Sequence, residues 1–305
     1  MQKVLWYVIY AILGLGLLLL VLAAVNAGRA AQNAAYYLTH PPKATPGGTP
    51  DSVGIDQWED VVFTTLDDKR IAAWFVPPKP EVDGAVIILV HGFGADRSRM
   101  LEEAAVFYDA GYGLLLPDLR NHGQSDGNVT TWGGVEAADV IAAVAYLQSR
   151  PEVNPDRIGA LGKSMGGAAV LRAAAREPGI KAVAAMSTYS TFVDNLPSIA
   201  NKMGGVPETF SGLVLRFMER EAGYFLTDVN GLEDVAAISP RPLLFVHGEQ
   251  DLLVAPSHSQ ALYEAASEPK QLTLVPGAGH TDILAANSDL FRRDVVGFFD
   301  AYLRP

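Results

Sequence analysis

The stretch Gly162-Lys163-Ser164-Met165-Gly166-Gly167 decides the fold, because it stands between an apolar run and an alanine-rich run. The apolar run before it, residues 158–161, predicts a strand, and residues 165–176 predict a helix. The pattern is Gly-x-Ser-x-Gly, in which a strained turn presents a serine hydroxyl and side chains at the glycines would clash. The spacing differs from Gly-x-x-x-x-Gly-Lys-[Ser/Thr], which argues against a phosphate-binding loop. We therefore predict that Ser164 is a nucleophile.

Outward from this turn, short apolar runs alternate with helical stretches from residue 57 to the C-terminus. The apolar runs are continuous, as in central strands covered on both faces, and they occupy residues 86–90, 114–116, 158–161, 183–186, 243–246 and 272–275. Helices are expected at about residues 99–110, 134–149, 165–176, 257–267 and 288–302. Residues 61–66 and 71–76 flank the turn Asp67-Asp68-Lys69 and predict a hairpin. The alternation predicts a mostly parallel, doubly wound α/β sheet, which binds ligands beyond the carboxyl ends of its strands.

About residues 190–238 form an insert that is much longer than an ordinary connection between a strand and the next. Apolar residues recur in it at helical spacing, which predicts helices. Additional core packing is one interpretation of the insert. We favour a lid that covers the site and shapes an apolar acyl pocket, because long ordered inserts at a strand end are often functional.

A serine hydroxyl is a poor nucleophile until a base takes its proton. The six histidines of the chain are His40, His91, His122, His247, His258 and His280. The last of them follows Val275-Pro276-Gly277-Ala278-Gly279, a loop of small residues that lets an imidazole reach across to the serine. The other five lie in a linker, at strand ends, in a loop or in a helix, where structural roles fit better. We predict that His280 is the general base.

The base needs a carboxylate that holds its tautomer and stabilises the imidazolium. Asp251 follows the next-to-last predicted strand, and the chain order Ser, Asp, His is that of an α/β-hydrolase. Glu249 is the nearest alternative, and Asp194 and Asp282 are weaker ones. A solvated loop carboxylate is the competing interpretation of Asp251.

The oxyanion that develops during acyl transfer needs preorganised N–H donors. The backbone N–H of Met165, directly after the nucleophile, supplies one donor in this geometry. The second donor should come from the loop His91-Gly92-Phe93-Gly94 after residues 86–90, and the backbone N–H of Phe93 is our choice.

The composition of the 305 residues excludes several other kinds of site. The formal net charge is −11, so a nucleic-acid partner is disfavoured, as is adhesion to anionic lipid through a basic patch. The chain has no cysteine, which excludes disulfides, thiolate metal sites and a cysteine nucleophile. No metal-binding cluster is evident in the sequence, and no cofactor is expected.

The N-terminal segment is a candidate membrane helix. Val4 to Val25 carries no charge, and a helix of this length spans roughly 33 Å, which is enough to cross the hydrocarbon core. The run exceeds the ~7–15-residue core of a signal peptide, although the small residues at Ala24–Ala27 leave a cleaved signal as the alternative. Lys3 beside the α-amine favours a cytoplasmic N-terminus and an extracytoplasmic catalytic domain. The expected organisation is a transmembrane anchor at 1–26, a Pro- and Gly-rich linker at 27–56 and a catalytic domain at 57–305.

Five elements occur in order: His91–Gly94, Asp118–Ser125, the turn at Ser164, the Asp251 loop and the His280 loop. Together they resemble the α/β-hydrolase superfamily over residues 57–305, and within it single-pass, membrane-anchored bacterial hydrolases. The resemblance implies an eight-stranded sheet with helices on both faces and acyl-enzyme chemistry without a cofactor. The chain also resembles the catalytic domain of prolyl-oligopeptidase-like peptidases, without their propeller domain.

The leading hypothesis is a serine hydrolase that cleaves a carboxylic ester or thioester with an apolar acyl chain, held to the lipid bilayer by its N-terminal helix. A serine peptidase or amidase is the alternative, because these enzymes share the triad. A non-catalytic binding module that has kept the fold is a third hypothesis, and the presence of all three triad residues disfavours it.

Overall fold

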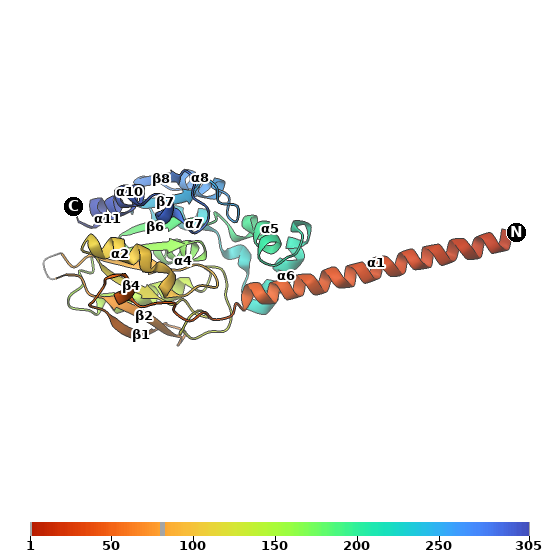
Figure 1. The fold of residues 1–305 in the computed structure, drawn as a ribbon, viewed down its shortest axis with the longest axis horizontal. Helices are drawn as coiled ribbons and strands as arrows, with labels where there is room; N and C mark the ends of the chain where they lie inside the picture. The colour runs from red at the N-terminus through yellow and green to blue at the C-terminus, as the bar shows by residue number, and fades with distance from the viewer. Residues whose placement is uncertain (1, 80–82, 305) are drawn as a thin grey trace.

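A single sheet of eight strands forms the centre of the molecule in the computed structural model, which describes residues 2–79 and 83–304 (Figure 1). The strands lie in the order β1-β2-β4-β3-β5-β6-β7-β8. The first two neighbouring pairs are antiparallel and the others are parallel. The strands are β1 (Glu59–Thr64), β2 (Arg70–Val76), β3 (Val86–Val90), β4 (Gly113–Pro117), β5 (Ile158–Lys163), β6 (Ala182–Met186), β7 (Leu243–Gly248) and β8 (Lys270–Val275). The predicted mostly parallel α/β sheet and its N-terminal hairpin are confirmed.

Both faces of the sheet are covered, which explains the continuous apolar runs. In β3, Val86, Ile88 and Val90 pack into one core, while Ile87 and Leu89 pack into the core on the other face. The helices of the first face are α3 (Ala137–Gln148), α4 (Met165–Ala174), α7 (Gly231–Ile238) and α8 (Ser257–Ala265). On the second face lie η2 (Arg97–Met100), α2 (Leu101–Asp109), α9 (Ile283–Ala286), α10 (Ser288–Leu290), the π-helical turn η5 (Phe291–Val296) and α11 (Gly297–Leu303).

The long insert is helical, as the spacing of its apolar residues predicts. Its elements are α5 (Phe192–Lys202), η3 (Glu208–Phe210), α6 (Ser211–Ala222), η4 (Leu226–Asp228) and α7. The last of these packs against α4 and covers the sheet, so it is part of the ordinary α/β layer. The remainder, residues 192–228, projects beyond the strand ends and is called the cap below (Figure 1).

The N-terminal helix α1 (Gln2–Thr39) is unbroken and long and apolar enough to cross a membrane. The linker was expected to begin at residue 27, but the helix continues to Thr39. The physical reason is burial: Ala31, Ala34, Ala35 and Leu38 pack against the cap, chiefly against α6. Small side chains on this face allow a close helix–helix approach.

Residues 40–49 then cross the domain as an irregular segment, here called the strap, before the short helix η1 (Pro50–Val53). Lys43 Nζ donates to the Ser125 carbonyl at 2.6 Å, and the backbone N–H of Gly47 donates to Ser98 Oγ at 3.0 Å. The prolines of this segment end the helix, as the sequence indicates. The strap is therefore held against the domain by defined contacts.

Candidate active site

The turn after β5 has the strained geometry expected of a nucleophile elbow. Ser164 has φ 53° and ψ −119°, a conformation that non-glycine residues rarely adopt. A Cβ at Gly162 would overlap the carbonyl of Gly166, and a Cβ at Gly166 would overlap the carbonyl of His91. Both positions therefore require glycine, since the chain passes itself too closely for a side chain.

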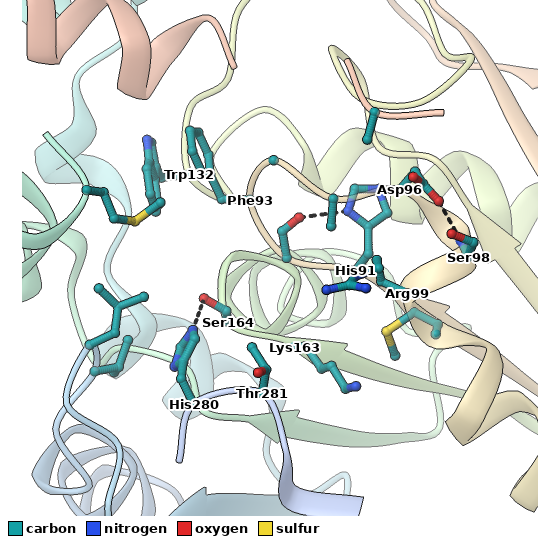
Figure 2. Close-up of a pocket in the computed structure, with 18 of the residues that line it drawn as sticks. His91, Phe93, Asp96, Ser98, Arg99, Trp132, Lys163, Ser164, His280 and Thr281 are labelled. Carbon is teal, nitrogen blue, oxygen red and sulfur yellow. Dashed lines mark hydrogen bonds between the residues drawn. The ribbon is translucent and has the colours of Figure 1, made fainter. Parts of the chain in front are cut away.

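Three predicted residues meet at the carboxyl edge of the sheet, and Figure 2 shows two of them, Ser164 and His280. His280 Nε2 lies 3.0 Å from Ser164 Oγ, and His280 Nδ1 lies 2.7 Å from Asp251 Oδ2. They come from the ends of β5, β7 and β8, and parallel strands place their carboxyl ends along one edge. The Asp251 carboxylate is fully buried, whereas the imidazole is 17% exposed. The geometry allows a proton to pass from the hydroxyl to the imidazole while the carboxylate fixes the imidazole tautomer.

Four donors surround the Asp251 carboxylate. Its Oδ1 accepts the backbone N–H groups of Leu253 and Val254, each at 2.9 Å. Its Oδ2 faces His280, and it also lies 3.2 Å from His247 Nε2. Burial raises the pKa of this carboxyl, but hydrogen bonds from the two histidines and from the backbone outweigh it and hold the pKa well below its usual range. Asp251 is therefore a carboxylate at neutral pH.

The contact of His247 with Asp251 was not predicted from the sequence, because His247 was given only a structural role. Its imidazole is fully buried, with Nδ1 2.6 Å from Ser259 Oγ and Nε2 2.9 Å from the Val254 carbonyl. The signal available in the sequence is its position four residues before Asp251 at a strand end.

The alternative carboxylates do not reach the imidazole. Glu249 is exposed, and the Asp194 carboxylate accepts the hydroxyl of Thr191, the residue that caps α5. Asp282 accepts the backbone N–H of Gly279 at 2.7 Å, so it shapes the loop that carries His280.

The two predicted oxyanion donors are the backbone N–H groups of Phe93, in the loop after β3, and of Met165, directly after Ser164. Within residues 2–79 and 83–304, neither the Phe93 N–H nor the Met165 N–H donates a hydrogen bond to the protein. A Cβ built on Gly92 would lie 3.4 Å from Ser164 Cβ, which shows how closely this loop approaches the serine. Both N–H groups are therefore available to a carbonyl oxygen of a substrate.

His122 holds the loop His91–Gly94 through a hydrogen bond. Its Nε2 accepts the backbone N–H of Gly94 at 3.1 Å, which requires its Nδ1 to carry the proton that is donated to the Arg120 carbonyl at 2.9 Å. His91 likewise accepts the N–H of Leu119 at 3.0 Å. Burial lowers the pKa of each histidine to about 4, so both are neutral at pH 7. The structural interpretation of these two histidines fits their contacts.

Lys163, the residue before the serine in the elbow, pairs with the buried carboxylate of Glu103 at 2.5 Å. Its ammonium is thus neutralised beside the turn. The contact gives the lysine a role in holding α2 near the elbow.

A cavity of about 690 Å³ contains Ser164 and His280 in its wall. One end is apolar, and there Phe93 stacks on Trp132 with ring centroids 4.3 Å apart (Figure 2). The cap closes this end with side chains of Ile199 and Met203. The other end is polar and is lined by Asp96, Ser98, Arg99 and Glu102. The strap contributes Ala44, Thr45 and Gly47 to the wall.

The doubly wound sheet, the serine turn after β5 and the histidine loop after β8 define the class of α/β-hydrolase folds. A family model described as the alpha/beta hydrolase fold matches residues 85–229. The chain is 31% identical over 261 residues to YfhR of Escherichia coli, an uncharacterized protein, and the match covers 83% of this chain and 84% of that protein. The chain belongs to the α/β-hydrolase superfamily.

Two solved structures show the same fold. The Pyrococcus furiosus esterase Pf2001 aligns with a TM-score of 0.72 at 24% identity, covering 87% of this chain and 98% of the esterase. Acetyl xylan esterase 1 of Thermoanaerobacterium aligns with a TM-score of 0.64 at 21% identity, covering 89% and 92% of the two chains. At these identities the two likenesses show the α/β-hydrolase fold.

Proposed function

We propose that this protein is a serine hydrolase that cleaves carboxylic esters through an acyl-enzyme on Ser164, with His280 as general base and Asp251 as its orienting acid. The observation that carries the proposal is the unbroken relay from Asp251 Oδ2 to His280 Nδ1 and from His280 Nε2 to Ser164 Oγ, at 2.7 and 3.0 Å. Each of the three groups has the partner that this chemistry requires.

In the first half of the proposed reaction, Ser164 Oγ attacks the ester carbonyl carbon while His280 Nε2 takes the hydroxyl proton. The carbonyl π electrons move to the oxygen, and the N–H groups of Phe93 and Met165 stabilise that oxyanion. When the tetrahedral intermediate collapses, the bond to the alkoxide breaks and the imidazolium gives its proton to the leaving alcohol. Asp251 stabilises the imidazolium by hydrogen bonding and keeps its own negative charge.

In the second half, a water molecule takes the place of the alcohol. His280 removes a proton from this water as its oxygen attacks the acyl carbon, and the same two N–H groups receive the charge. Collapse releases the carboxylic acid and returns the proton to Ser164 Oγ. The cycle therefore needs only an ester and water.

The cavity favours an ester with one apolar portion. The stacked rings of Phe93 and Trp132, together with Ile199 and Met203, offer an apolar wall on one side of the hydroxyl. An acyl chain fits this side, with the alcohol portion toward the polar end. Cavities of this size commonly bury a small organic ligand. The cap is thus a lid in the sense that it supplies part of the acyl pocket.

We further propose that Val4–Val25 anchors the enzyme in a bilayer as a single-pass helix, with residues 1–26 as the anchor and the catalytic domain extracytoplasmic. The unbroken course of α1 through residues 24–27 supports an uncleaved anchor, because the helix continues directly into the part that packs on the cap. In this arrangement residues 57–305 form the hydrolase domain, and residues 27–56 connect it to the membrane.

The test is the replacement Ser164→Ala in the full chain, assayed with p-nitrophenyl butyrate and with a fluorophosphonate probe. We expect loss of at least 10³-fold in kcat and no covalent labelling, because the hydroxyl is the nucleophile. The matched control is Ser267→Ala, an exposed serine away from the cavity, which should keep both activities. Turnover retained by Ser164→Ala would refute the assignment, and a wild-type protein that neither labels nor hydrolyses would favour a binding module.

A further inference from the structure

The membrane helix and the cap form one packed unit. The face of α1 that carries Ala31, Ala34 and Leu38 is buried against the cap, whereas the side chains before residue 27 are almost all exposed. A Cβ built on Gly204, at the end of α5, would lie 2.9 Å from Ala34 Cβ. The contact is therefore close, and α1 reaches the domain as a helix fixed against α6 (Figure 1).

The direction of α6 follows from contacts at its C-terminal end. The Tyr224 ring, just beyond α6, lies against Gly134, and nearby Trp132 Nε1 donates to the Leu38 carbonyl at 2.8 Å. The C-terminal end of α6 thus lies near the C-terminal end of α1, and the two helices run in the same direction. The N-terminal end of α6 points back toward the apolar half of α1.

The rise of an α-helix places this end close to the apolar segment. The 12 residues of α6 span about 18 Å, so its first turn lies about level with Ala27 and Gly28 of α1. Ala27 and Gly28 are partly buried, as expected if the first turn of α6 lies beside them. The apolar run ends at Val25, only about 3–5 Å away along the axis at 1.5 Å per residue.

Residues 207–210, which precede α6, are here called the cap tip. All four are exposed, and Phe210 presents 39% of its surface although it is aromatic. The headgroup layer on each side of the hydrocarbon core is about 5–7 Å thick. A cap tip level with residues 27–28 would therefore lie within that layer, where aromatic side chains are favourable.

The apolar end of the cavity lies on the same side of the domain. Met203 lines it and is the neighbour of Gly204, which packs on Ala34. Phe93 lines it and contacts the Tyr37 ring of α1 edge-on, with centroids 6.3 Å apart. The end of α1 and the apolar wall of the cavity are thus in direct contact.

We propose that the cap tip lies against the surface of the bilayer that α1 crosses, and that the substrate is an amphiphilic acyl ester drawn from this bilayer. Its apolar chain would enter the end of the cavity lined by Phe93 and Met203, and its polar portion would face Asp96 and Arg99. The choice of substrate rests on the proposed function, whereas the docking surface rests on the packing of α1 and on the proposed membrane anchor.

The docking surface is tested without reference to catalysis. Because the natural chain has no cysteine, Thr209→Cys and Ala301→Cys each give a single site for an environment-sensitive fluorophore. The first lies in the cap tip, and the second is exposed on α11, at the far end of the domain from the cap (Figure 1). The labelled full-length chains are reconstituted in phosphatidylcholine vesicles that contain a headgroup spin-labelled lipid. We expect at least threefold stronger quenching at position 209 than at position 301, and equal quenching would overturn the docking surface.

The substrate class is tested by moving the domain away from the bilayer. A helical insertion of seven residues between Val25 and Asn26 adds about 10 Å and nearly two full turns, so the packed face of α1 is retained. We expect turnover of a long-chain acyl ester in the same vesicles to fall at least tenfold, while turnover of a soluble butyrate ester stays within twofold. The same insertion between Lys3 and Val4 is the matched control and should change neither rate.

The outcomes separate the two proposals. Unchanged turnover of the vesicle ester after the insertion at Val25 would overturn the bilayer as substrate source. If the wild-type chain hydrolysed neither ester, the proposed function would fail, and the quenching result would still decide whether the cap tip docks.

Discussion

Replacement of Asp251 by Asn tests the relay most directly, because the structure dictates how the amide must orient. Oδ1 accepts two backbone N–H groups at 2.9 Å, from Leu253 and Val254, so the amide oxygen must take that position. The NH₂ group then faces His280 Nδ1, at the place where Oδ2 now lies at 2.7 Å. An amide donor there requires Nδ1 to be an acceptor, which moves the ring proton to Nε2. An imidazole with a proton on Nε2 cannot accept the hydroxyl proton of Ser164.

The expected loss in kcat for Asp251→Asn is therefore about 10⁴-fold, the magnitude known for a wrong tautomer in a Ser-His-Asp triad. This corresponds to about 5 kcal/mol in the activation free energy. KM should change little, because the carboxylate lies behind the histidine and outside the cavity. The assay is steady-state hydrolysis of p-nitrophenyl butyrate, with the rate of fluorophosphonate labelling as a second measurement.

A matched control distinguishes this effect from a general loss of negative charge. Asp282→Asn alters a neighbouring carboxylate that accepts a single backbone N–H, from Gly279, and an amide oxygen can replace it. We expect this variant to stay within about threefold of wild type. If Asp251→Asn were folded and lost less than tenfold in kcat, the relay would not operate as described.

The remaining predictions concern the elbow, the buried histidines and the cavity. Gly166→Ala places a Cβ against the carbonyl of His91 and should lower the free energy of unfolding by at least 2–3 kcal/mol in urea titrations. Gly212→Ala is the control and should not lower it, because its Cβ meets no atom within 4 Å. Equal stabilities of the two variants would contradict the steric account. Burial lowers the folded-state pKa of His91 and of His122 from 6.5 to about 4, so between pH 8 and pH 5 only the unfolded chain takes up protons at these two histidines. The free energy of unfolding should therefore decrease by about 2 kcal/mol per histidine as the pH falls from 8 to 5. Urea titrations of wild type and His122→Gln check this, since the variant should lose roughly half of the pH-dependent change; a stability independent of pH would refute it. Met203→Phe should narrow the apolar end of the cavity and lower kcat/KM for a dodecanoate ester about tenfold relative to butyrate, and an unchanged ratio would show that the chain binds elsewhere.

The N-terminal helix shows how far the sequence alone predicts the structure. A count of uncharged residues predicts a spanning helix that ends near Val25, because hydrophobicity is a local property. It does not predict that the helix continues to Thr39, since the alanines beyond residue 27 resemble a flexible linker until α6 is placed beside them. The same applies to the strap, whose prolines and glycines indicate irregular structure but not its position along the wall of the cavity.

The sequence by itself determined the order of strands and helices along the chain, and it predicted Ser164, Asp251 and His280 as the candidate site, because apolar periodicity and glycine sterics act over a few residues. Only the tertiary structure decided which groups meet. The second histidine on Asp251, the support of the Phe93 loop by His122, and the contact between α1 and the cap all join residues from separate segments. The physical reason is that these contacts form between side chains of different elements, so the role of a hydrogen-bond donor or of an alanine depends on the atom that the fold places against it.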